Sequence, residues 1–406
     1  MESIKQIFKI GFGPSSSHTM GPLRAATMFL QRNPSAARFE VVLYGSLAAT
    51  GKGHMTDVSL LQVLQPHAPT TILWEPQTVL PFHTNGMLFR SFDTAGAEME
   101  AWTVFSIGGG NLANEEFDEQ KSSNIYEMEH ILRIQDWCQH TGHSYWEYVD
   151  QCEQSDIWDY LAEVWQVMQS AVERGIDAEG VLPGGLGLRR KACDYLIRAQ
   201  GIGSNIRTRG LVYAYALAVS EENAAGGKIV TAPTCGSCGV LPAVLYHLKK
   251  SRDFTDARIL RALATAGLFG NVVRTNASVS GAEVGCQGEV GVACAMAAAA
   301  ACQLFGGTPA QIEYAAEMGL EHHLGLTCDP VCGMVQIPCI ERNAFAATRA
   351  LDANIYASFS DGRHRVSFDQ VVEVMRQTGK DLPSLYKETA QGGLAKQDLV
   401  PPMFNN

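Results

Sequence analysis

The sequence contains no apolar run long enough to cross a lipid bilayer. A membrane-spanning helix needs about 20 predominantly apolar residues, whereas the longest such run, 290–302, is shorter and rich in alanine. The N-terminal residues also lack the basic start, apolar centre and small-residue cleavage site of a signal peptide. We therefore expect a cytoplasmic protein that does not bind a membrane.

Positive charge is also scarce. The chain has 31 lysine and arginine residues against 42 aspartate and glutamate residues, which gives a formal net charge of −11 at pH 7. Nucleic acids and anionic membranes attract proteins with a positive surface, so neither is an expected partner. The triple glycine at 108–110 is not followed by a helix with the glycine spacing of a dinucleotide-binding turn. A small molecule is the expected partner.

Two sequence patterns divide the chain. Up to about residue 120, short β-branched and aromatic runs alternate with helical patterns and are separated by Gly, Pro, Asn or Asp, which predicts an α/β or α+β domain over 1–120. The strands are predicted at 39–47, 70–76, 86–93 and 98–110. Residues 111–124 are polar and unpatterned, as in a linker. From 125 to 406, apolar residues recur every three or four positions, which predicts a mostly α-helical domain.

A serine-rich loop precedes the first predicted helix. The stretch GFGPSSSHTMGP offers several hydroxyl groups and backbone N–H groups just before a helix that has proline in its first turn. Such a loop can bind a carboxylate or a phosphate. An ordinary helix cap in a solvated loop is the alternative. The candidate ligand-binding residues here are Ser15, Ser16, Ser17, His18 and Thr19.

Two further loops carry histidine beside glycine or asparagine. In GKGHMTD, Lys52 and His54 lie on a glycine-rich loop that follows a predicted strand. Histidine titrates near neutrality, so His54 is a candidate general base. In FHTNGM, His83 and Asn85 are further candidates, although a simple turn between two strands also explains them.

Six of the eleven cysteines lie in loop-like, glycine- or proline-rich surroundings that suit metal binding: Cys235, Cys238, Cys286, Cys328, Cys332 and Cys339. Cys286, Cys328 and Cys339 form one candidate set. The spacings of 42 and 11 residues are too wide for a zinc ribbon or a compact ferredoxin motif. They fit a site that is assembled from the ends of several helices. Three thiolates without an evident fourth would leave one metal coordination position open, as a Lewis-acid catalyst requires.

The remaining cysteines allow other interpretations. In a reducing compartment they are not expected to form disulfides, and five are expected to be small packing residues: Cys138, Cys152, Cys193, Cys294 and Cys302. The pairs Cys235-x2-Cys238 and Cys328-x3-Cys332 could instead form a four-thiolate metal site.

Taken together, the motifs resemble those of the bacterial iron–sulfur L-serine dehydratases. The resemblance runs from about residue 10 to 351 and rests on GPSSSHTMGP, YGSLAATGKGH, HTNGM, SIGGG, LPGGLGLRRKA, ENAAGGKIVTAPT, SGAEVGCQGEVGVACAMAAA, GLTCDPV and PCIERNA. It implies that the protein deaminates L-serine to pyruvate and ammonia with a [4Fe–4S] cluster and without pyridoxal phosphate. This chain departs from the family pattern at TAPTCGSCG, where cysteine replaces the usual asparagine.

The resemblance also implies roles for individual residues. The cluster ligands would be Cys286, Cys328 and Cys339, which leaves one iron free to bind the hydroxyl and carboxylate groups of serine. The catalytic histidines would be His54, as the base that removes the Cα proton, with His18 and His83. The substrate-binding residues would be Ser15, Ser16, Ser17, Thr19, Lys52 and Asn85. The N-terminal domain would resemble the allosteric substrate-binding domain of some phosphoglycerate dehydrogenases, and the protein would be a homodimer.

Three rival interpretations stay open at this point. The same chemistry could act on L-threonine or L-cysteine. A non-catalytic iron–sulfur redox sensor would use the cysteines but leaves the histidine loops without a role. A structural zinc protein would contain zinc and no sulfide.

Overall fold

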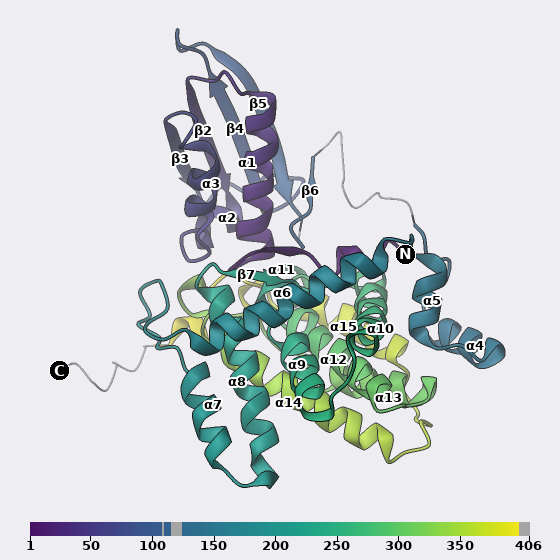
Figure 1. Cartoon of the computed structure of the whole chain (residues 1–406). Helices are drawn as coiled ribbons and strands as arrows, with labels where there is room; N and C mark the ends of the chain where they lie inside the picture. Colours follow the sequence, from purple (N-terminus) through teal and green to yellow (C-terminus); the bar gives the residue numbers. More distant parts are fainter. Residues whose placement is uncertain (108, 115–123, 398–406) are drawn as a thin grey trace.

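The computed structural model describes residues 1–107, 109–114 and 124–397. It has a mixed part with one five-stranded sheet and a larger helical part (Figure 1). Each part has its own hydrophobic core. This architecture confirms the predicted order of an α/β region followed by a helical region. The predicted linker, 111–124, and the boundary near residue 120 fall largely outside the described residues.

The five-stranded sheet has the order β3-β2-β4-β5-β6, with β2 and β3 parallel and the other pairs antiparallel. Its strands are β2 (Arg38–Tyr44), β3 (Thr70–Glu75), β4 (Gly86–Phe92), β5 (Glu98–Ser106) and β6 (Leu112–Ala113). Three helices belong to this part: α1 (Gly21–Arg32), α2 (Gly45–Thr50) and α3 (Thr56–Leu64). All four predicted strands are present, because their alternating apolar residues face a core built around Phe29, Phe89 and Trp102.

The first predicted strand was expected to continue to residue 47, and this extension is wrong. The strand ends at Tyr44, and α2 begins at Gly45, whose φ of +52° is a left-handed conformation. A side chain at this glycine would also meet the carbonyl oxygen of Thr84 at 2.4 Å. A glycine here therefore turns the chain sharply, and the loop after α2 carries His54.

The chain begins in the helical part, before it enters the sheet. Met1, Ile4, Ile7 and Phe8 are buried in the helical core, with η1 (Ile4–Gln6) among them. Strand β1 (Ile10–Phe12) then pairs antiparallel with β7 (Lys228–Val230), and Figure 1 shows this pair beside the helices. The serine-rich loop follows directly, as the wide helix η2 (Ser16–Met20), and so lies where the two parts meet.

The helical part surrounds one apolar helix. Its α-helices are α4 (Ile131–Thr141), α5 (Tyr145–Cys152), α6 (Ile157–Asp177), α7 (Ala192–Gly201), α8 (Ser204–Ala224), α9 (Val240–Arg252), α10 (Asp256–Asn276), α11 (Gly281–Val284), α12 (Val292–Leu304), α13 (Pro309–Glu321), α14 (Cys339–Ser358) and α15 (Phe368–Asp381). Helix α12 packs against α9, α10, α13 and α14. Its alanines let neighbours approach closely: a Cβ on Gly319 of α13 would lie 2.9 Å from the backbone of Ala295.

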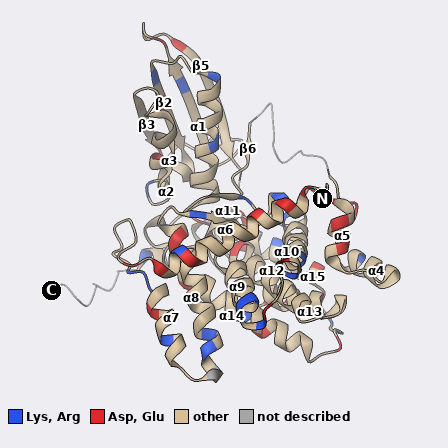
Figure 2. Cartoon of the chain, viewed as in Figure 1, with Lys and Arg blue, Asp and Glu red and all other residues tan. Residues whose placement is uncertain are grey.

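Short helical turns connect these helices and include several site residues. They are η4 (Cys235–Ser237), η5 (Gln287–Gly291), η6 (Val331–Gly333), η7 (Ser384–Tyr386) and η8 (Gly393–Lys396). Figure 2 shows that both acidic and basic residues occur along the helices in this view. In the described part of the chain, no helix combines the length and the apolar character needed to span a membrane.

Candidate active site

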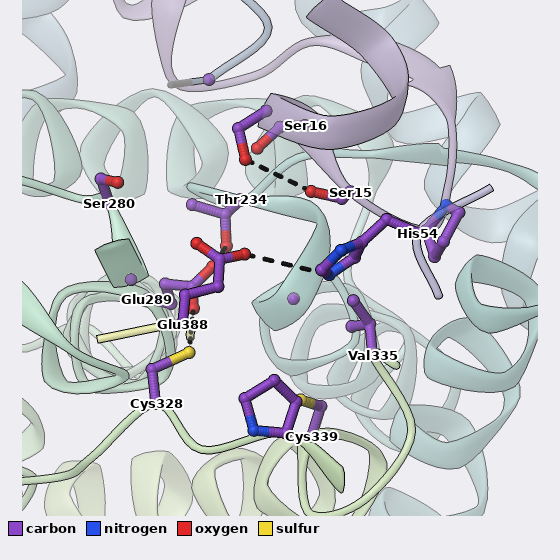
Figure 3. Close-up of a pocket in the computed structure, with 16 residues that line it drawn as sticks. Ser15, Ser16, His54, Thr234, Ser280, Glu289, Cys328, Val335, Cys339 and Glu388 are labelled. Carbon is purple, nitrogen blue, oxygen red and sulfur yellow. Dashed lines mark hydrogen bonds and ion pairs between the residues drawn. The ribbon is translucent and has the colours of Figure 1, made fainter. Parts of the chain in front are cut away.

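A cavity lies at the junction of the two parts of the molecule (Figure 3). It is lined by the serine-rich loop, by one histidine, by two cysteines and by two glutamates. The lining residues are Pro14, Ser15, Ser16, Ser17, His54, Gly109, Thr234, Gly236, Ser280, Gly281, Glu289, Cys328, Pro330, Val335, Cys339 and Glu388. These residues come from seven separate stretches of sequence, so the cavity exists only in the folded chain.

The serine-rich loop is held between the two parts by hydrogen bonds. Ser15 caps η2, and its hydroxyl accepts a hydrogen bond from the backbone N–H of His18 at 3.1 Å. Asn223 of α8 donates to the carbonyl oxygen of Pro14 at 2.9 Å, which ties the loop to the helical part. The hydroxyl-bearing residues Ser15, Ser16 and Ser17 line the cavity. They provide donors for an anionic group of a small ligand.

His54 is fully buried on the loop between α2 and α3, and its ring faces the cavity. Its Nδ1 lies 3.2 Å from the carbonyl oxygen of Thr50, and a carbonyl can only accept, so Nδ1 carries the proton. Burial lowers the pKa of His54 to about 4, and the ring is therefore neutral at pH 7. Its Nε2 has no hydrogen-bond partner among the described residues. An uncharged imidazole with a free Nε2 lone pair is a suitable base.

The other two predicted catalytic histidines, His18 and His83, are not among the residues that line the cavity. The ring centres of His18 and His54 lie 4.5 Å apart. The Nδ1 atom of His18 lies 2.8 Å from the Ser17 hydroxyl, and its Nε2 atom lies 3.2 Å from the Ser46 hydroxyl. Burial, followed by the proximity of His54, lowers the pKa of His18 well below its usual value. His83 accepts a hydrogen bond from the backbone of Asn85 at 3.0 Å and is not among the lining residues.

Three predicted substrate-binding residues also lie outside the cavity lining. The Thr19 hydroxyl donates to the carbonyl oxygen of His54 at 2.7 Å, so it orients the histidine loop. Lys52 is exposed, with its amine 5.6 Å from the ring centre of Trp74. Asn85 is buried, and its side-chain amide donates to the carbonyl oxygen of Ser106.

Cys328 and Cys339 lie on the opposite side of the cavity from Ser15 and Ser16 (Figure 3), and Cys286 lies close to Cys328. Cys328 and Cys339 line the cavity. The sulfur atoms of Cys286 and Cys328 and a carboxylate oxygen of Glu289 all lie within 4.8 Å of one another. Cys339 is the first residue of α14, where the partial positive charge of a helix N-terminus favours a thiolate.

The thiols and carboxylates of the site crowd one another. Contact with the Cys286 thiol, together with burial, raises the pKa of Cys328, and burial raises the pKa of Cys339. Burial likewise raises the pKa of Glu289. Burial and the nearby Glu289 raise the pKa of Glu388 to about 8. Buried acidic groups of this kind are stabilised by a cation. The donor set therefore fits a metal group held by thiolates.

Two residues of the PCIERNA motif support this arrangement. Arg342 is largely buried beside Cys286 and Cys339, and its guanidinium donates to the carbonyl oxygen of Thr327 at 2.6 Å. Asn343 donates to the carbonyl oxygen of Gly236 at 2.7 Å and thus fixes η4 against the start of α14. A positive charge beside thiols favours their ionised form.

The alternative four-thiolate site is not assembled in the structure. Cys235 and Cys238 are buried in η4, whereas Cys332 is exposed. Within residues 1–107, 109–114 and 124–397, Cys286, Glu289 and Cys328 form the only close group of three potential metal ligands. The Cys235 thiol instead contacts the sulfur of Met20 at 3.5 Å. Packing is also the outcome for Cys138, Cys294 and Cys302, which are buried, while Cys152 and Cys193 are half-buried.

Glu388 is a site residue that sequence reasoning missed. It follows α15 in an irregular stretch, KETAQGG, without periodicity or a neighbouring histidine or cysteine. Its carboxylate faces His54 across the cavity (Figure 3), with 4.0 Å between a carboxylate oxygen and Nε2. A polar residue among glycines near the end of the chain was the only local signal, and such residues are common in loops.

Comparisons with known proteins agree with this geometry. The model of the serine dehydratase beta chain matches residues 3–73 and 63–117, and that of the serine dehydratase alpha chain matches residues 93–395. An L-serine dehydratase of Streptomyces coelicolor is 41% identical over 97% of this chain and 98% of its own length. The L-serine dehydratase TdcG of Escherichia coli is 41% identical (97% and 99%), and an L-serine dehydratase of Helicobacter pylori is 35% identical (97% and 98%). The chain therefore belongs to the serine dehydratase family.

Proposed function

We propose that this protein converts L-serine to pyruvate and ammonia by eliminating water across the Cα–Cβ bond. The observation that carries this proposal is the opposition of two kinds of group across one cavity. A neutral histidine and the three serines of the serine-rich loop line it together with Cys328 and Cys339, and Cys286 lies close to Cys328. Elimination needs a base at Cα and an electron-withdrawing group at the hydroxyl, and the cavity brings candidates for both within one small volume.

We propose Cys286, Cys328 and Cys339 as the ligands of a [4Fe–4S] cluster. Three thiolates would hold a four-iron cluster without a fourth protein ligand, and such a cluster, when bound, would supply a Lewis acid for the departure of the hydroxyl group. Pyridoxal phosphate, by contrast, requires a lysine for its Schiff base. The described residues that line the cavity include no lysine.

The chain's own residues have separate tasks in this proposal. His54 takes the Cα proton at Nε2, while the Nδ1–H contact with Thr50 keeps that lone pair directed into the cavity. The hydroxyls of Ser15, Ser16 and Ser17 bind the carboxylate of the substrate. His18 and Thr19 hold the ring and the backbone of His54 in place. The enamine that leaves then hydrolyses to pyruvate and ammonia in water.

The predicted roles of His83, Lys52 and Asn85 are narrower in this proposal. Asn85 and His83 form a turn beside the cavity, and Lys52 lies on the outside of the histidine loop. They act on the shape of the loops and do not touch the reacting atoms.

The test is pyruvate formation from L-serine under strict anaerobiosis, repeated after exposure to air. We expect turnover that air abolishes together with the cluster absorbance. L-threonine and L-cysteine, assayed in parallel, should react more slowly. Zinc without sulfide in the purified protein, or equal rates before and after air exposure, would refute the cluster proposal.

We further propose that the protein works as a homodimer in the cytoplasm, as family membership suggests. The sheet part, with its helices α1 and α3, would correspond to the allosteric substrate-binding domain to which the sequence pointed. Light scattering coupled to size exclusion, at protein concentrations spanning a hundredfold, would measure the mass in solution. A monomer at every concentration would contradict the dimer.

A further inference from the structure

Among the described residues that line the cavity, two glutamates carry the only carboxyl groups that could pair with the ammonium group that distinguishes an amino acid from a hydroxy acid. Among the described lining residues, the acidic ones are Glu289 and Glu388, and none is lysine or arginine. An L-serine zwitterion presents a carboxylate, a hydroxyl and an ammonium group. The serine-rich loop and the cysteine side account for the first two. We propose that Glu388 binds the α-ammonium group of the substrate; this inference rests on the proposed function and names a residue for it.

Glu289 is already engaged by neighbouring side chains. Its carboxylate accepts a hydrogen bond from the Thr234 hydroxyl at 2.7 Å. The thiols of Cys286 and Cys328 lie 3.7 and 3.9 Å from its other oxygen. It therefore belongs to the cysteine side of the cavity, where it has little capacity left for a ligand.

Glu388 is free to accept. In the described part of the chain, the one ion-pair contact of its side chain is with His54, at 4.0 Å, which exceeds hydrogen-bond distance. His54 is neutral, as its buried position and Nδ1 contact dictate, so it supplies no positive charge to Glu388. The side chain of Glu388 is only 13% exposed. A carboxyl group that lines the cavity, is largely buried and has no cation beside it among the described residues is a site for a positively charged donor that comes with the ligand.

The backbone holds Glu388 firmly in this position. Its φ of +58° is a left-handed conformation, which a residue with a side chain adopts only when its surroundings impose it. Its N–H donates to the carbonyl oxygen of Cys328 at 2.9 Å, and the N–H of Cys328 donates to Tyr386 at 2.8 Å. Farther along, the N–H of Leu394 donates to Asp329 at 2.8 Å. Residues 386–394 are thus hydrogen-bonded to the Cys328 loop on both sides of Glu388.

Glu388 also lies close to His54, the proposed base. The Cα atom of serine carries both the proton that His54 removes and the ammonium group. A residue that binds the ammonium must therefore lie within a few ångströms of the base. Glu388 satisfies this requirement, and its contact would fix the Cα–H bond against Nε2.

The experiment compares two ligands that differ only in the ammonium group, L-alanine and propionate, by anaerobic titration calorimetry on the holoenzyme. The variants are Glu388→Gln, Glu388→Asp and, as a matched control, Glu163→Gln on the exposed face of α6. Wild type should bind L-alanine more tightly than propionate. Glu388→Gln should weaken L-alanine about 10-fold or more, since a charge-assisted contact is lost, and leave propionate within about twofold. Glu388→Asp should recover part of the loss, and Glu163→Gln should match wild type.

Equal weakening of both ligands, or no change in either, would overturn the assignment. So would a wild type that does not distinguish the two ligands. Iron and sulfide contents equal to wild type show that Glu388→Gln keeps its site. Pyruvate formation by wild type is measured separately, so that a wild type that binds L-alanine through Glu388 but forms no pyruvate would refute the proposed function alone.

Discussion

At the residue scale, the contact between His54 and Thr50 decides which nitrogen can act. Because the carbonyl of Thr50 requires the proton on Nδ1, Nε2 is left to accept a proton in the cavity. The low pKa of His54, about 4 through burial, keeps this nitrogen available throughout the neutral range. Hydrogen bonds from Thr19 to the loop backbone, and the packing of His18, keep the ring in place.

Replacing this histidine tests its role. His54→Gln should lower kcat by about 10²–10⁴-fold, the usual contribution of a general base, and leave iron and sulfide contents unchanged. Anaerobic steady-state kinetics with metal analysis measure both. His67→Gln, at an exposed position of the same part of the chain, is the control. Near-normal turnover in His54→Gln would assign the base to another residue, with His18 the next to test.

A glycine beside the cysteines offers a second test at this scale. A Cβ on Gly281 would lie 2.5 Å from Glu289 and 3.2 Å from the Cys328 sulfur. Gly281→Ala should therefore push these groups apart and reduce the iron and sulfide bound per chain to less than about half of the wild-type content. At Gly185, a Cβ meets nothing within 4 Å, so Gly185→Ala should retain both. Full metal content in Gly281→Ala would show that the close approach is dispensable.

Individual residues also show how far the sequence could predict the site. Cys286, Cys328, Cys339 and His54 could be singled out, because they lie in glycine- or proline-rich stretches that match motifs of the family. Glu388 could not, because a glutamate in a loop near the end of a chain is ordinary. Glu388 reaches the site only because residues 386–388 form backbone hydrogen bonds with Cys328.

At the element scale, helices α13 and α15 are linked by a titratable pair. His364 lies 2.8 Å from the Glu313 carboxylate, and the backbone N–H at the start of α15 donates to the same carboxylate at 2.6 Å. The contact with Glu313 raises the pKa of His364. Nearby, burial raises the pKa of Glu317 to about 7, with Glu321 as a further cause. Protonation of His364 therefore strengthens its contact with Glu313.

The sign of the pH dependence follows from the raised pKa of His364. Its contribution to the free energy of unfolding is complete below pH 6.5, the usual value, and disappears as the pH rises through the folded value. His364→Gln should therefore destabilise the protein more at pH 6 than at pH 9. Anaerobic denaturant unfolding of both proteins at the two pH values measures the difference. A larger effect at pH 9 would contradict the ion pair.

The elements themselves were largely predictable, with exceptions that have physical causes. Alternation and three-to-four spacing identified the strands and helices, since one face of each is buried. The predicted strand over 39–47 failed at its end, because Gly45 adopts a left-handed conformation and packs too closely against the carbonyl oxygen of Thr84 to carry a side chain. The pairing of β1 with β7 was also beyond reach, since about 220 residues separate the partners in the sequence.

At the scale of the whole molecule, the site is the place where the two parts meet. The sheet part contributes His54, and the serine-rich loop connects it to the helical part. The helical part contributes the cysteines and both glutamates. Met1, Ile4, Ile7 and Phe8 are buried in the helical core, so the chain enters and leaves the sheet part from the same body. The two parts are consequently anchored by residues at both ends of the sheet region.

The central claim is that three cysteines hold a cluster on which L-serine deamination depends. The most direct measurement is the iron content, the acid-labile sulfide content and the anaerobic rate of pyruvate formation for Cys328→Ala beside Cys332→Ala. Cys328 lies in the cavity, while Cys332, four residues later, is exposed. Cys328→Ala should lose cluster and activity together, and Cys332→Ala should keep both. Full activity in Cys328→Ala, or an equal loss in Cys332→Ala, would contradict the account.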